Sequence, residues 1–192
     1  MNVFDFDKTI YDGDSTVDFW KYCLKKYPKT RRHLLHTGWS ALKFGLKIMK
    51  KTAFKEDFYS FLQEVEDVDA ALAEFWVSHE VKIKQWYLDM QKEDDVIISA
   101  SPEFLLMPIC KKLGIKTMMA SKVDPKTGKY DGANCHGEEK VRRYKAKFGN
   151  AQIHEFYSDS YIDTPLAKLA FDPILVKGND FEPWSEKELT KK

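Results

Sequence analysis

Two aspartates, Asp5 and Asp7, are separated by one residue in the segment Val-Phe-Asp-Phe-Asp-Lys-Thr near the start of the sequence. The apolar residues before them predict a strand, and a strand places side chains i and i+2 on the same side. Two carboxylates at a strand end can bind a divalent cation, or one can be a nucleophile while the other transfers protons. A solvated edge strand or a helix-capping turn has the same pattern. Other residues of the sequence must therefore show whether the two aspartates form a chemical site.

More polar residues follow later apolar segments, and these could join the two aspartates. Ser99 follows one such segment, Asp159 and Asp163 follow another, and Lys140 lies at the start of a predicted helix. In an open α/β sheet, ligands bind beyond the carboxyl ends of the strands, so these residues would meet at one edge. A hydroxyl and a cation can hold phosphate oxygens, while carboxylates bind Mg2+. The set predicts phosphoryl transfer, in which a carboxylate can act as the nucleophile.

The elements that would position these residues alternate along the chain. Segments that predict strands lie at 2–6, 96–100, 117–120, 153–157 and 174–176. Between the later strands, helical patterns marked by early proline or terminal glycine lie at 102–113, 138–148 and 164–170. This alternation predicts an α/β fold with a Rossmann-like, mostly parallel sheet flanked by helices. A small hairpin is expected at 122–131.

A long helix-like stretch, residues 15–89, separates the first strand from the second. Its first residues, Ser-Thr-Val-Asp at 15–18, resemble a capping box, and Asp12-Gly13-Asp14 before them is expected to form a hinge and helix cap. We therefore expect a core domain of residues 1–12 and 90–192 and a small all-helical cap domain of residues 13–89. An insertion beside a suspected site is a candidate lid.

The composition is that of one folded unit with a second, smaller one. The chain has 192 residues, 43% of them hydrophobic, and a net charge of +1, which gives no reason to expect a nucleic-acid partner. Three scattered cysteines without metal-ligand spacing predict buried thiols in a reducing compartment. No signal peptide and no run of 18 apolar residues is visible. We therefore expect no transmembrane segment and a cytoplasmic location. The oligomeric state cannot be predicted from these features.

Four motifs, in this order, resemble those of the haloacid dehalogenase-like superfamily of phosphohydrolases over nearly the whole chain. They are the segment Asp5–Thr9, the serine Ser99, the lysine Lys140 and the segment Ser158–Asp163. The insertion directly after the first motif resembles the helical cap of the phosphoserine phosphatase-like branch. The resemblance implies Mg2+-dependent hydrolysis of a phosphate monoester through an aspartyl-phosphate, with a small phosphorylated metabolite as the substrate.

The same resemblance implies roles for the motif residues. Asp5 is the expected nucleophile, and Asp7 is the expected general acid/base. The implied cofactor is Mg2+, held by Asp5, Asp159 and Asp7, the last through its main-chain carbonyl. Ser99 and Lys140 are expected to bind the phosphoryl group. Thr9 and Asp163 are expected to support the site.

The residues expected to recognise the substrate depart from those of phosphoserine phosphatases. Ala100-Ser101-Pro102 follows the motif serine where those enzymes carry two glycines, and Pro offers no N–H. Ile162 replaces a common asparagine, and Asp14 stands where those enzymes have glutamate, which makes it a candidate specificity residue. No arginine suited to a substrate carboxylate is found in the later cap helices. These departures argue against phosphoserine, although phosphoserine phosphatase, a phosphotransferase and a catalytically silent binding module remain alternatives.

The first half of the insertion is strongly basic. No Asp or Glu occurs from 21 to 55, whereas Lys and Arg recur at 21, 25, 26, 29, 31, 32, 43, 47, 50, 51 and 55. Trp39, Leu42, Leu46 and Met49 repeat at helical spacing beside some of these lysines. The favoured interpretation is an ordinary cap helix with a packed apolar face. The alternative is peripheral contact with an anionic membrane, which would suit a lipid phosphate such as phosphatidylglycerol phosphate.

The histidines are weaker candidates for function. His33 and His36 are interpreted as a basic surface pair, because two histidines three residues apart on a helix are far more often solvated than metal-bound. His136 precedes Lys140 closely and is expected to border the site without a defined role.

Overall fold

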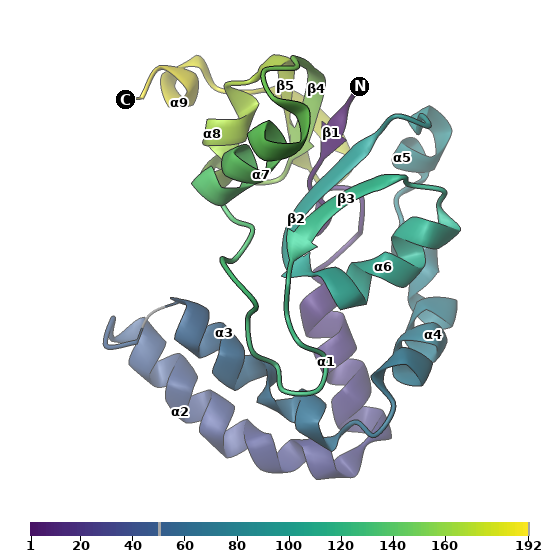
Figure 1. The fold of residues 1–192 in the computed structure, drawn as a ribbon, viewed down its shortest axis with the longest axis vertical. Helices are drawn as coiled ribbons and strands as arrows, with labels where there is room; N and C mark the ends of the chain where they lie inside the picture. The colour runs from purple at the N-terminus through teal and green to yellow at the C-terminus, as the bar shows by residue number, and fades with distance from the viewer. Residues whose placement is uncertain (50, 192) are drawn as a thin grey trace.

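The computed structural model describes residues 1–49 and 51–191, with residues 51 and 52 described by their backbone alone. The described strands form one six-stranded sheet in the order β3-β2-β1-β4-β5-β6 (Figure 1). Its parallel strands are β1 (Val3–Phe4), β2 (Val96–Pro102), β3 (Thr117–Ser121), β4 (Ile153–Ser158) and β5 (Ala170–Lys177). At one edge, β6 (Asp180–Pro183) runs antiparallel to β5. The predicted α/β fold with a mostly parallel sheet is confirmed.

Apolar side chains project from both faces of the sheet. Phe4 and Ile97 belong to one buried cluster, together with Leu105 of α6 (Glu103–Lys112). Val3 and Val96 belong to a second cluster, with Tyr144 of α7 (Glu138–Phe148) and Leu166 of α8 (Thr164–Ala167). Neighbouring residues of one strand thus point to opposite faces, and helices cover both.

Three predicted boundaries are wrong. β1 has two residues instead of the five of 2–6, because the chain turns at once into the loop that carries the aspartates. The helix predicted at 164–170 ends at Ala167, because Ala170 already pairs with Ile153 in the sheet. β5 is accordingly longer than 174–176. β6 and the short helix α9 (Glu186–Thr190) were not predicted, since β6 has four residues, all exposed, and ends in a proline, which is uncommon within strands.

The described part of the insertion consists of helices joined by short turns. In order, it contains α1 (Ser15–Lys26), η1 (Pro28–His33), α2 (Leu34–Gly45), α3 (Lys51–Tyr59), η2 (Ser60–Glu64), α4 (Val68–His79), η3 (Glu80–Lys82) and α5 (Gln85–Met90). The predicted capping box at 15–18 is wrong, because Asp14 is the N-cap of α1 and its Oδ1 accepts the Val17 N–H at 3.0 Å. Asp18 instead accepts hydrogen bonds from Tyr11 and Lys82.

The second half of the insertion is packed against the sheet domain. The indole of Trp76 on α4 donates a buried hydrogen bond to the Leu105 carbonyl at 2.8 Å, and the Tyr87 ring of α5 lies 5.0 Å from the Phe4 ring. In Figure 1, α4 and α5 lie beside α6 and β2, whereas α2 and α3 form a pair at the far end of the molecule. The domain limits at residues 12, 13, 89 and 90 stay a prediction.

A loop from the sheet reaches the insertion. The predicted hairpin at 122–131 is present as a bridge between Val123 and Tyr130, and the long connection between β3 and α7 extends toward α1 and α3 (Figure 1). The Tyr130 N–H donates to Glu56, and Gly128 touches the backbone of Tyr59. The hairpin therefore braces the lower end of α3 from the side of the sheet domain.

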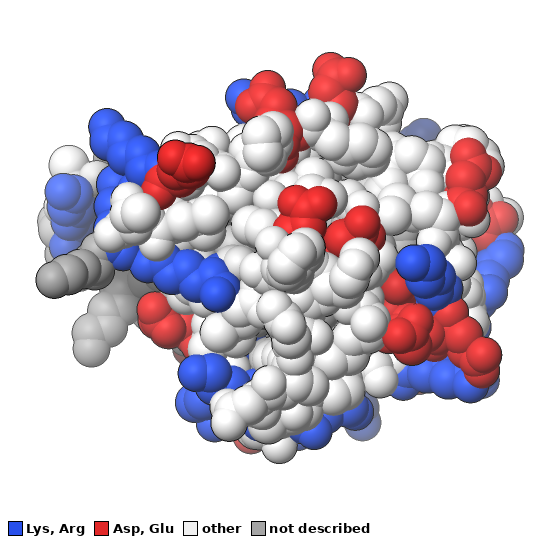
Figure 2. All heavy atoms as spheres, turned by 90° about the horizontal axis from the view of Figure 1, so that it is seen from above, with Lys and Arg blue, Asp and Glu red and all other residues white. Residues whose placement is uncertain are grey.

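One face of the molecule carries charges of both signs (Figure 2). On the face seen from above, Figure 2 shows Lys and Arg mainly around the periphery, with Asp and Glu both there and near the centre. All three cysteines are buried and free, as the prediction of buried thiols requires. None of the helices in residues 1–49 and 51–191 has the length and apolar character needed to cross a bilayer.

The close approach of Gly128 to the Tyr59 backbone can be tested with two substitutions, one at Gly128 and one at Gly114. Gly128 has φ +74°, and a Cβ there would lie 2.6 Å from the Tyr59 carbonyl oxygen, while Gly114 has φ +73° and open space around it. Both Gly→Ala changes incur a left-handed backbone cost of about 1 kcal/mol. Gly128→Ala should lower the unfolding free energy by a further ~1–3 kcal/mol, because the Tyr59 backbone must move. Urea denaturation of both variants checks this, and equal losses would contradict the contact.

Candidate functional site

The aspartates Asp5 and Asp7 leave the sheet at the carboxyl end of β1. The Asp5 N–H donates to the Tyr157 carbonyl at 2.8 Å, which extends the pairing of β1 with β4 by one residue. Asp7 then forms an isolated bridge with Tyr11, and Lys8 between them has φ +57°. A left-handed lysine is an uncommon conformation, and it turns the chain sharply within the motif.

A cavity of about 500 Å³ lies at this end of the sheet. Most of the predicted site residues line it, namely Asp5, Asp7, Asp14, Ser99, Lys140, Asp159 and Asp163. Thr9 is fully buried instead, and its Oγ1 accepts the Asp159 N–H at 3.1 Å, so it joins the two loops that carry aspartates. The predicted convergence of these residues at one edge of the sheet is therefore observed.

Lys140 lies between two carboxylates at the centre of the site. Its Nζ is 2.8 Å from Asp5 Oδ1 and 2.6 Å from Asp163 Oδ2, and its side chain is 2% exposed. Burial alone lowers the pKa of Lys140, but the charges of Asp5 and Asp163 outweigh it and raise the pKa above the usual value. Ser158 Oγ also donates to Asp163 at 2.9 Å, so the ammonium is held in one place and stays charged.

Asp7 faces the first turn of the cap. Its Oδ1 accepts the Ser15 N–H at 2.6 Å, and its Oδ2 accepts the hydroxyl of Ser101, which is also 3.1 Å from the Thr16 hydroxyl. Burial, followed by the charge of Asp14, raises the pKa of Asp7 to about 6, although the two serine hydrogen bonds oppose the rise. A carboxyl with this pKa can hold a proton or release it near neutral pH.

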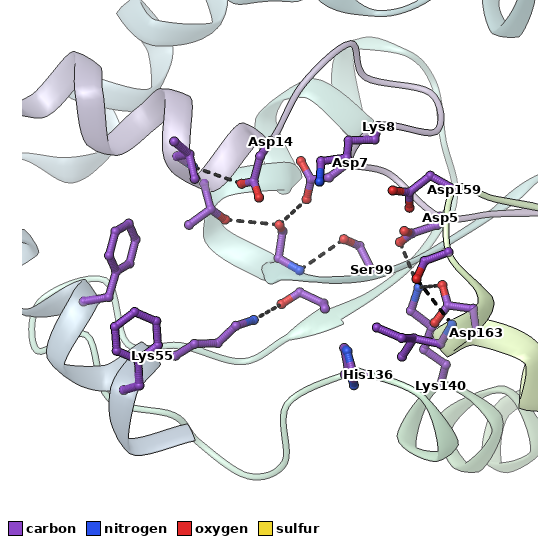
Figure 3. Close-up of a pocket in the computed structure, with 18 of the residues that line it drawn as sticks. Asp5, Asp7, Lys8, Asp14, Lys55, Ser99, His136, Lys140, Asp159 and Asp163 are labelled. Atoms are coloured by element: carbon purple, nitrogen blue, oxygen red, sulfur yellow. Dashed lines mark hydrogen bonds and ion pairs between the residues drawn. The ribbon is translucent and has the colours of Figure 1, made fainter. Parts of the chain in front are cut away.

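The acidic groups suit a divalent cation. Asp5 and Asp159 lie side by side next to Lys140 in Figure 3. Burial raises the pKa of Asp5 to about 7 and also raises that of Asp159, so both carboxylates are partly desolvated. No three His, Cys, Asp or Glu side chains of the described residues are grouped to hold a metal by themselves. Mg2+ fits such a site, because it binds through one or two carboxylates and retains water.

Ser99 forms the floor of the cavity. It is 1% exposed, and its Oγ accepts the Ser101 N–H at 3.1 Å. From sequence, Ser101 was only a departure from a glycine pair, and its contact with Asp7 was not predicted. The signal was present, because residues 99 and 101 of one strand point to the same side.

The cap supplies the opposite wall of the cavity. Phe54, Lys55 and Phe58 of α3 line it, and Lys55 Nζ reaches 3.3 Å from both the Ala100 carbonyl and Asn134 Oδ1 (Figure 3). These residues were not predicted. The spacing of Phe54 and Phe58, one helical turn apart, was a usable signal for an apolar face toward the site. His136 also lines the cavity, as expected.

Lys84 holds the turn of the first motif from behind. It is 7% exposed, and its Nζ donates to the carbonyls of Lys8, at 2.8 Å, and Gly178. Its N–H donates to the Ile10 carbonyl at 2.8 Å. Since Lys84 directly precedes α5, the last helix of the insertion, one residue ties this part of the insertion to the loop between Asp7 and Thr9. No sequence signal identified it.

The chain is similar in sequence to a known protein family and to a known enzyme. A model of the haloacid dehalogenase-like hydrolase family matches residues 3–168. A histidinol-phosphatase of Neisseria meningitidis serogroup C (strain 8013) is 25% identical over 206 aligned residues, which cover 92% of this chain and 89% of that protein.

Two solved structures share the fold. A protein with unknown function from Bordetella pertussis Tohama I has a TM-score of 0.74 and 18% identity, covering 91% of this chain and 88% of that one. A phosphoserine phosphohydrolase-like protein from Francisella tularensis subsp. tularensis SCHU S4 has a TM-score of 0.56 and 14% identity, covering 91% and 87%.

The fold and the family match define a hydrolase with an α/β core and a helical insertion after the first strand. The chain belongs to the haloacid dehalogenase-like hydrolase family, because the family model covers most of its length. It is an enzyme, a phosphatase of this family. The expected similarity in fold to the phosphoserine phosphatase-like branch is also confirmed.

The raised pKa of Asp7 predicts how stability changes with pH in metal-free protein. The folded state binds the Asp7 proton more tightly than the unfolded chain, whose aspartates titrate near 3.8. The resulting stability is present below that pH and is lost as the pH rises through about 6. An asparagine at position 7 does not ionise, so Asp7→Asn does not share this loss. The unfolding free energy of Asp7→Asn minus that of wild type should therefore increase by about 2 kcal/mol from pH 4 to pH 7.5.

Urea denaturation in a chelator at both pH values measures this difference. Asp172→Asn, at an exposed aspartate, is the control and should show no such trend. Parallel pH profiles for wild type and Asp7→Asn would contradict the burial of an ionisable Asp7.

The contacts of Lys84 predict a loss of both stability and turnover in Lys84→Met. The partly buried hydrogen bonds to the carbonyls of Lys8 and Gly178 are lost, which should cost about 1–2 kcal/mol. Because the turn between Asp7 and Thr9 is loosened, we expect kcat to fall while KM changes little. Lys84→Arg keeps a cationic donor and should recover part of both. Lys116→Met, at an exposed ion pair with Glu93, serves as the control. A Lys84→Met variant with normal kcat would show that Lys84 does not position the loop.

Proposed function

We propose that the protein is a Mg2+-dependent phosphatase that hydrolyses phosphate monoesters through a phosphoryl group carried on Asp5. The observation that carries the proposal is the single cavity lined by Asp5, Asp7, Ser99, Lys140 and Asp159, with Lys140 bonded to Asp5. Nucleophile, proton donor, hydroxyl and cation are all within one space of a size that suits a small substrate.

In the first proposed step, a carboxylate oxygen of Asp5 attacks phosphorus. Asp5 Oδ1 is already hydrogen-bonded to Lys140, so we assign the attack to Oδ2. The new O–P bond forms as the bond from phosphorus to the substrate alcohol breaks. Protonated Asp7 transfers its proton to the departing alcohol oxygen, which removes the cost of an alkoxide leaving group.

In the second proposed step, water attacks the same phosphorus. Asp7, now ionised, accepts the proton of the water, the Asp5–phosphorus bond breaks, and inorganic phosphate leaves. Lys140 and the Ser99 hydroxyl hold the phosphoryl oxygens through both steps, which fixes the line of attack. The serine hydrogen bonds to Asp7 keep its carboxyl in one orientation while it gives and regains a proton.

The metal requirement follows from the charge at the site. Asp5, Asp159 and the main-chain carbonyl of Asp7 are the groups that would hold Mg2+, with Asp163 supporting the site through Lys140. When bound, Mg2+ would neutralise the negative charge of the phosphoryl oxygens beside these carboxylates.

The proposed substrate class is a small phosphorylated metabolite. The aromatic rings of Phe54 and Phe58 offer an apolar wall for the part of the substrate beyond the phosphate, and Lys55 lies between them in sequence. The Asp14 carboxylate caps α1, so its effect on specificity would depend on the position of that helix. Pro102, which lacks an N–H and ends β2, still argues against phosphoserine. The cytoplasmic location stays a prediction.

The proposal is tested by following hydrolysis of a generic aryl phosphate with Mg2+ and with a chelator. Asp5→Asn should reduce kcat by at least about a thousandfold, because no carboxylate nucleophile remains. Asp7→Asn should turn over slowly and accumulate phosphoenzyme, which acid-quenched mass spectrometry detects as a gain of one phosphoryl group. Asp172→Asn should behave as wild type.

Two outcomes would redirect the proposal. Equal rates for wild type, chelated wild type and Asp5→Asn would exclude the mechanism. New phosphoesters formed when alcohols are added would instead identify a phosphotransferase, which shares the same covalent step.

A further inference from the structure

The outer face of α2 is apolar and exposed. Leu35, Trp39, Leu42 and Leu46 recur at helical spacing, with exposed fractions of 88%, 59%, 52% and 62%. We refer to these four residues as the outer stripe. Ile48 beyond the helix is 74% exposed. The favoured interpretation from sequence, an apolar face packed within the cap, is therefore wrong for this helix.

The opposite face of α2 already holds the helix in the fold. Ser40 is 2% exposed, and its Oγ donates to Asp57 of α3 at 2.7 Å. The Phe44 ring stacks on Phe54 with 5.0 Å between centroids. Because polar and aromatic contacts on this inner face join α2 to α3, the outer stripe is not needed for the packing of the cap.

The surroundings of the outer stripe are cationic. Residues 28–49 contain no Asp or Glu. Exposed or half-exposed basic residues on this segment are Lys29, Arg31, Arg32, His36, Lys43 and Lys47. The Lys43 ammonium lies 5.7 Å from the centre of the Trp39 ring, so charge and stripe are directly adjacent. Arg32 is paired with Glu64. Lys50 and the side chain of Lys51, part of the basic segment noted from sequence, lie outside the described residues.

We propose that α2 docks on an anionic lipid bilayer, with the outer stripe at the interface between headgroups and acyl chains. An interfacial helix combines Leu and Trp on one face with Lys and Arg near the headgroups, which is the arrangement of α2. The flanking cations would bind headgroup phosphates, and their attraction would add to apolar burial. The contact is peripheral, through one face of one helix.

A protein partner matches the surface less well. The buried centres of protein interfaces are depleted in lysine, and here Lys43 contacts the central Trp39. A second copy of the chain is disfavoured by charge. Pairing two α2 helices would bring their cations together, and residues 28–49 supply no acid to compensate.

Docking would also set where the enzyme acts. α3, which is joined to α2 by the inner-face contacts, carries Phe54, Lys55 and Phe58 of the cavity wall. Docking would hold that wall near the bilayer, where phosphomonoesters of lipids are presented. The docking itself does not rest on the proposed phosphatase mechanism, so the two can be tested separately.

The test uses the full chain and two kinds of vesicle, phosphatidylcholine alone and phosphatidylcholine mixed with phosphatidylglycerol. Co-sedimentation measures the partition coefficient at low and high salt, and brominated lipid quenches tryptophans that enter the bilayer. We expect binding to the anionic vesicles that weakens as salt rises. We also expect quenching that disappears in Trp39→Phe, which removes the exposed indole of the outer stripe.

Matched variants distinguish binding through the outer stripe from nonspecific hydrophobic binding to vesicles. The double variant Leu42→Ser, Leu46→Ser should lower the partition coefficient at least about tenfold, because two apolar side chains leave the interface. Lys43→Gln should lower it about fivefold, the loss expected for one cation near an anionic surface. Val77→Ser is the control, because Val77 on α4 is 76% exposed but lies outside the stripe.

Three outcomes would overturn the proposal. These are no binding to anionic vesicles at low salt, equal binding by the double variant and wild type, and a self-associated state in sedimentation velocity that the double variant loses. The last would assign the stripe to a second copy. Hydrolysis of soluble aryl phosphate by the double variant should match wild type, so failed docking and failed catalysis are distinguishable.

Discussion

The buried ammonium of Lys140 is the interaction on which the rest of the structure depends. It lies between Asp5, which follows β1, and Asp163, which follows β4, while Lys140 itself comes from α7. Each of these charges would be costly to bury alone, and each is tolerated because the other two are in place. The adjacency of β1 and β4 in the sheet brings the two carboxylates together, so assembly of the core and assembly of the site are one event. The remaining carboxylates, Asp7 and Asp159, complete a site whose negative charge exceeds what one lysine offsets.

The two aspartates of the first motif are held by different parts of the molecule. Asp5 is bonded to the sheet domain through Tyr157 and Lys140. Asp7 accepts the Ser15 N–H from the cap and the Ser101 hydroxyl from β2. The nucleophile proposed for the reaction therefore has fixed surroundings, whereas the proposed acid/base depends on where the first turn of the cap lies. Substrate selection by the cap and proton transfer by Asp7 are linked through that turn.

Order and spacing along the sequence were enough to predict the convergence of Asp5, Ser99, Lys140 and Asp159, because parallel strands end at one edge of the sheet. The contacts of Lys84 were beyond reach, since they join its side chain to the carbonyls of Lys8 and Gly178, groups that every residue carries. β6 has only four residues, all exposed, and ends in Pro183, so its sequence is too short and too turn-like to indicate a strand. For α2, the periodicity was identified correctly, but periodicity shows that a helix has an apolar face without showing what covers it. Ser40 and Phe44, on the other side, decided the orientation.

The shortness of β1 has a consequence for how the chain folds. Val3 pairs with Val96 on one side and with Phe156 on the other, so this two-residue strand closes two very long loops. Closing a long loop costs conformational entropy before any sheet contact repays it. The helical insertion forms mostly local contacts, and the bonds of Lys82 and Lys84 to Asp12 and Ile10 bring its two ends together. A folded insertion thus shortens the distance that β1 and β2 must span, and we expect the rate of sheet formation to follow the stability of a segment that contributes no strand.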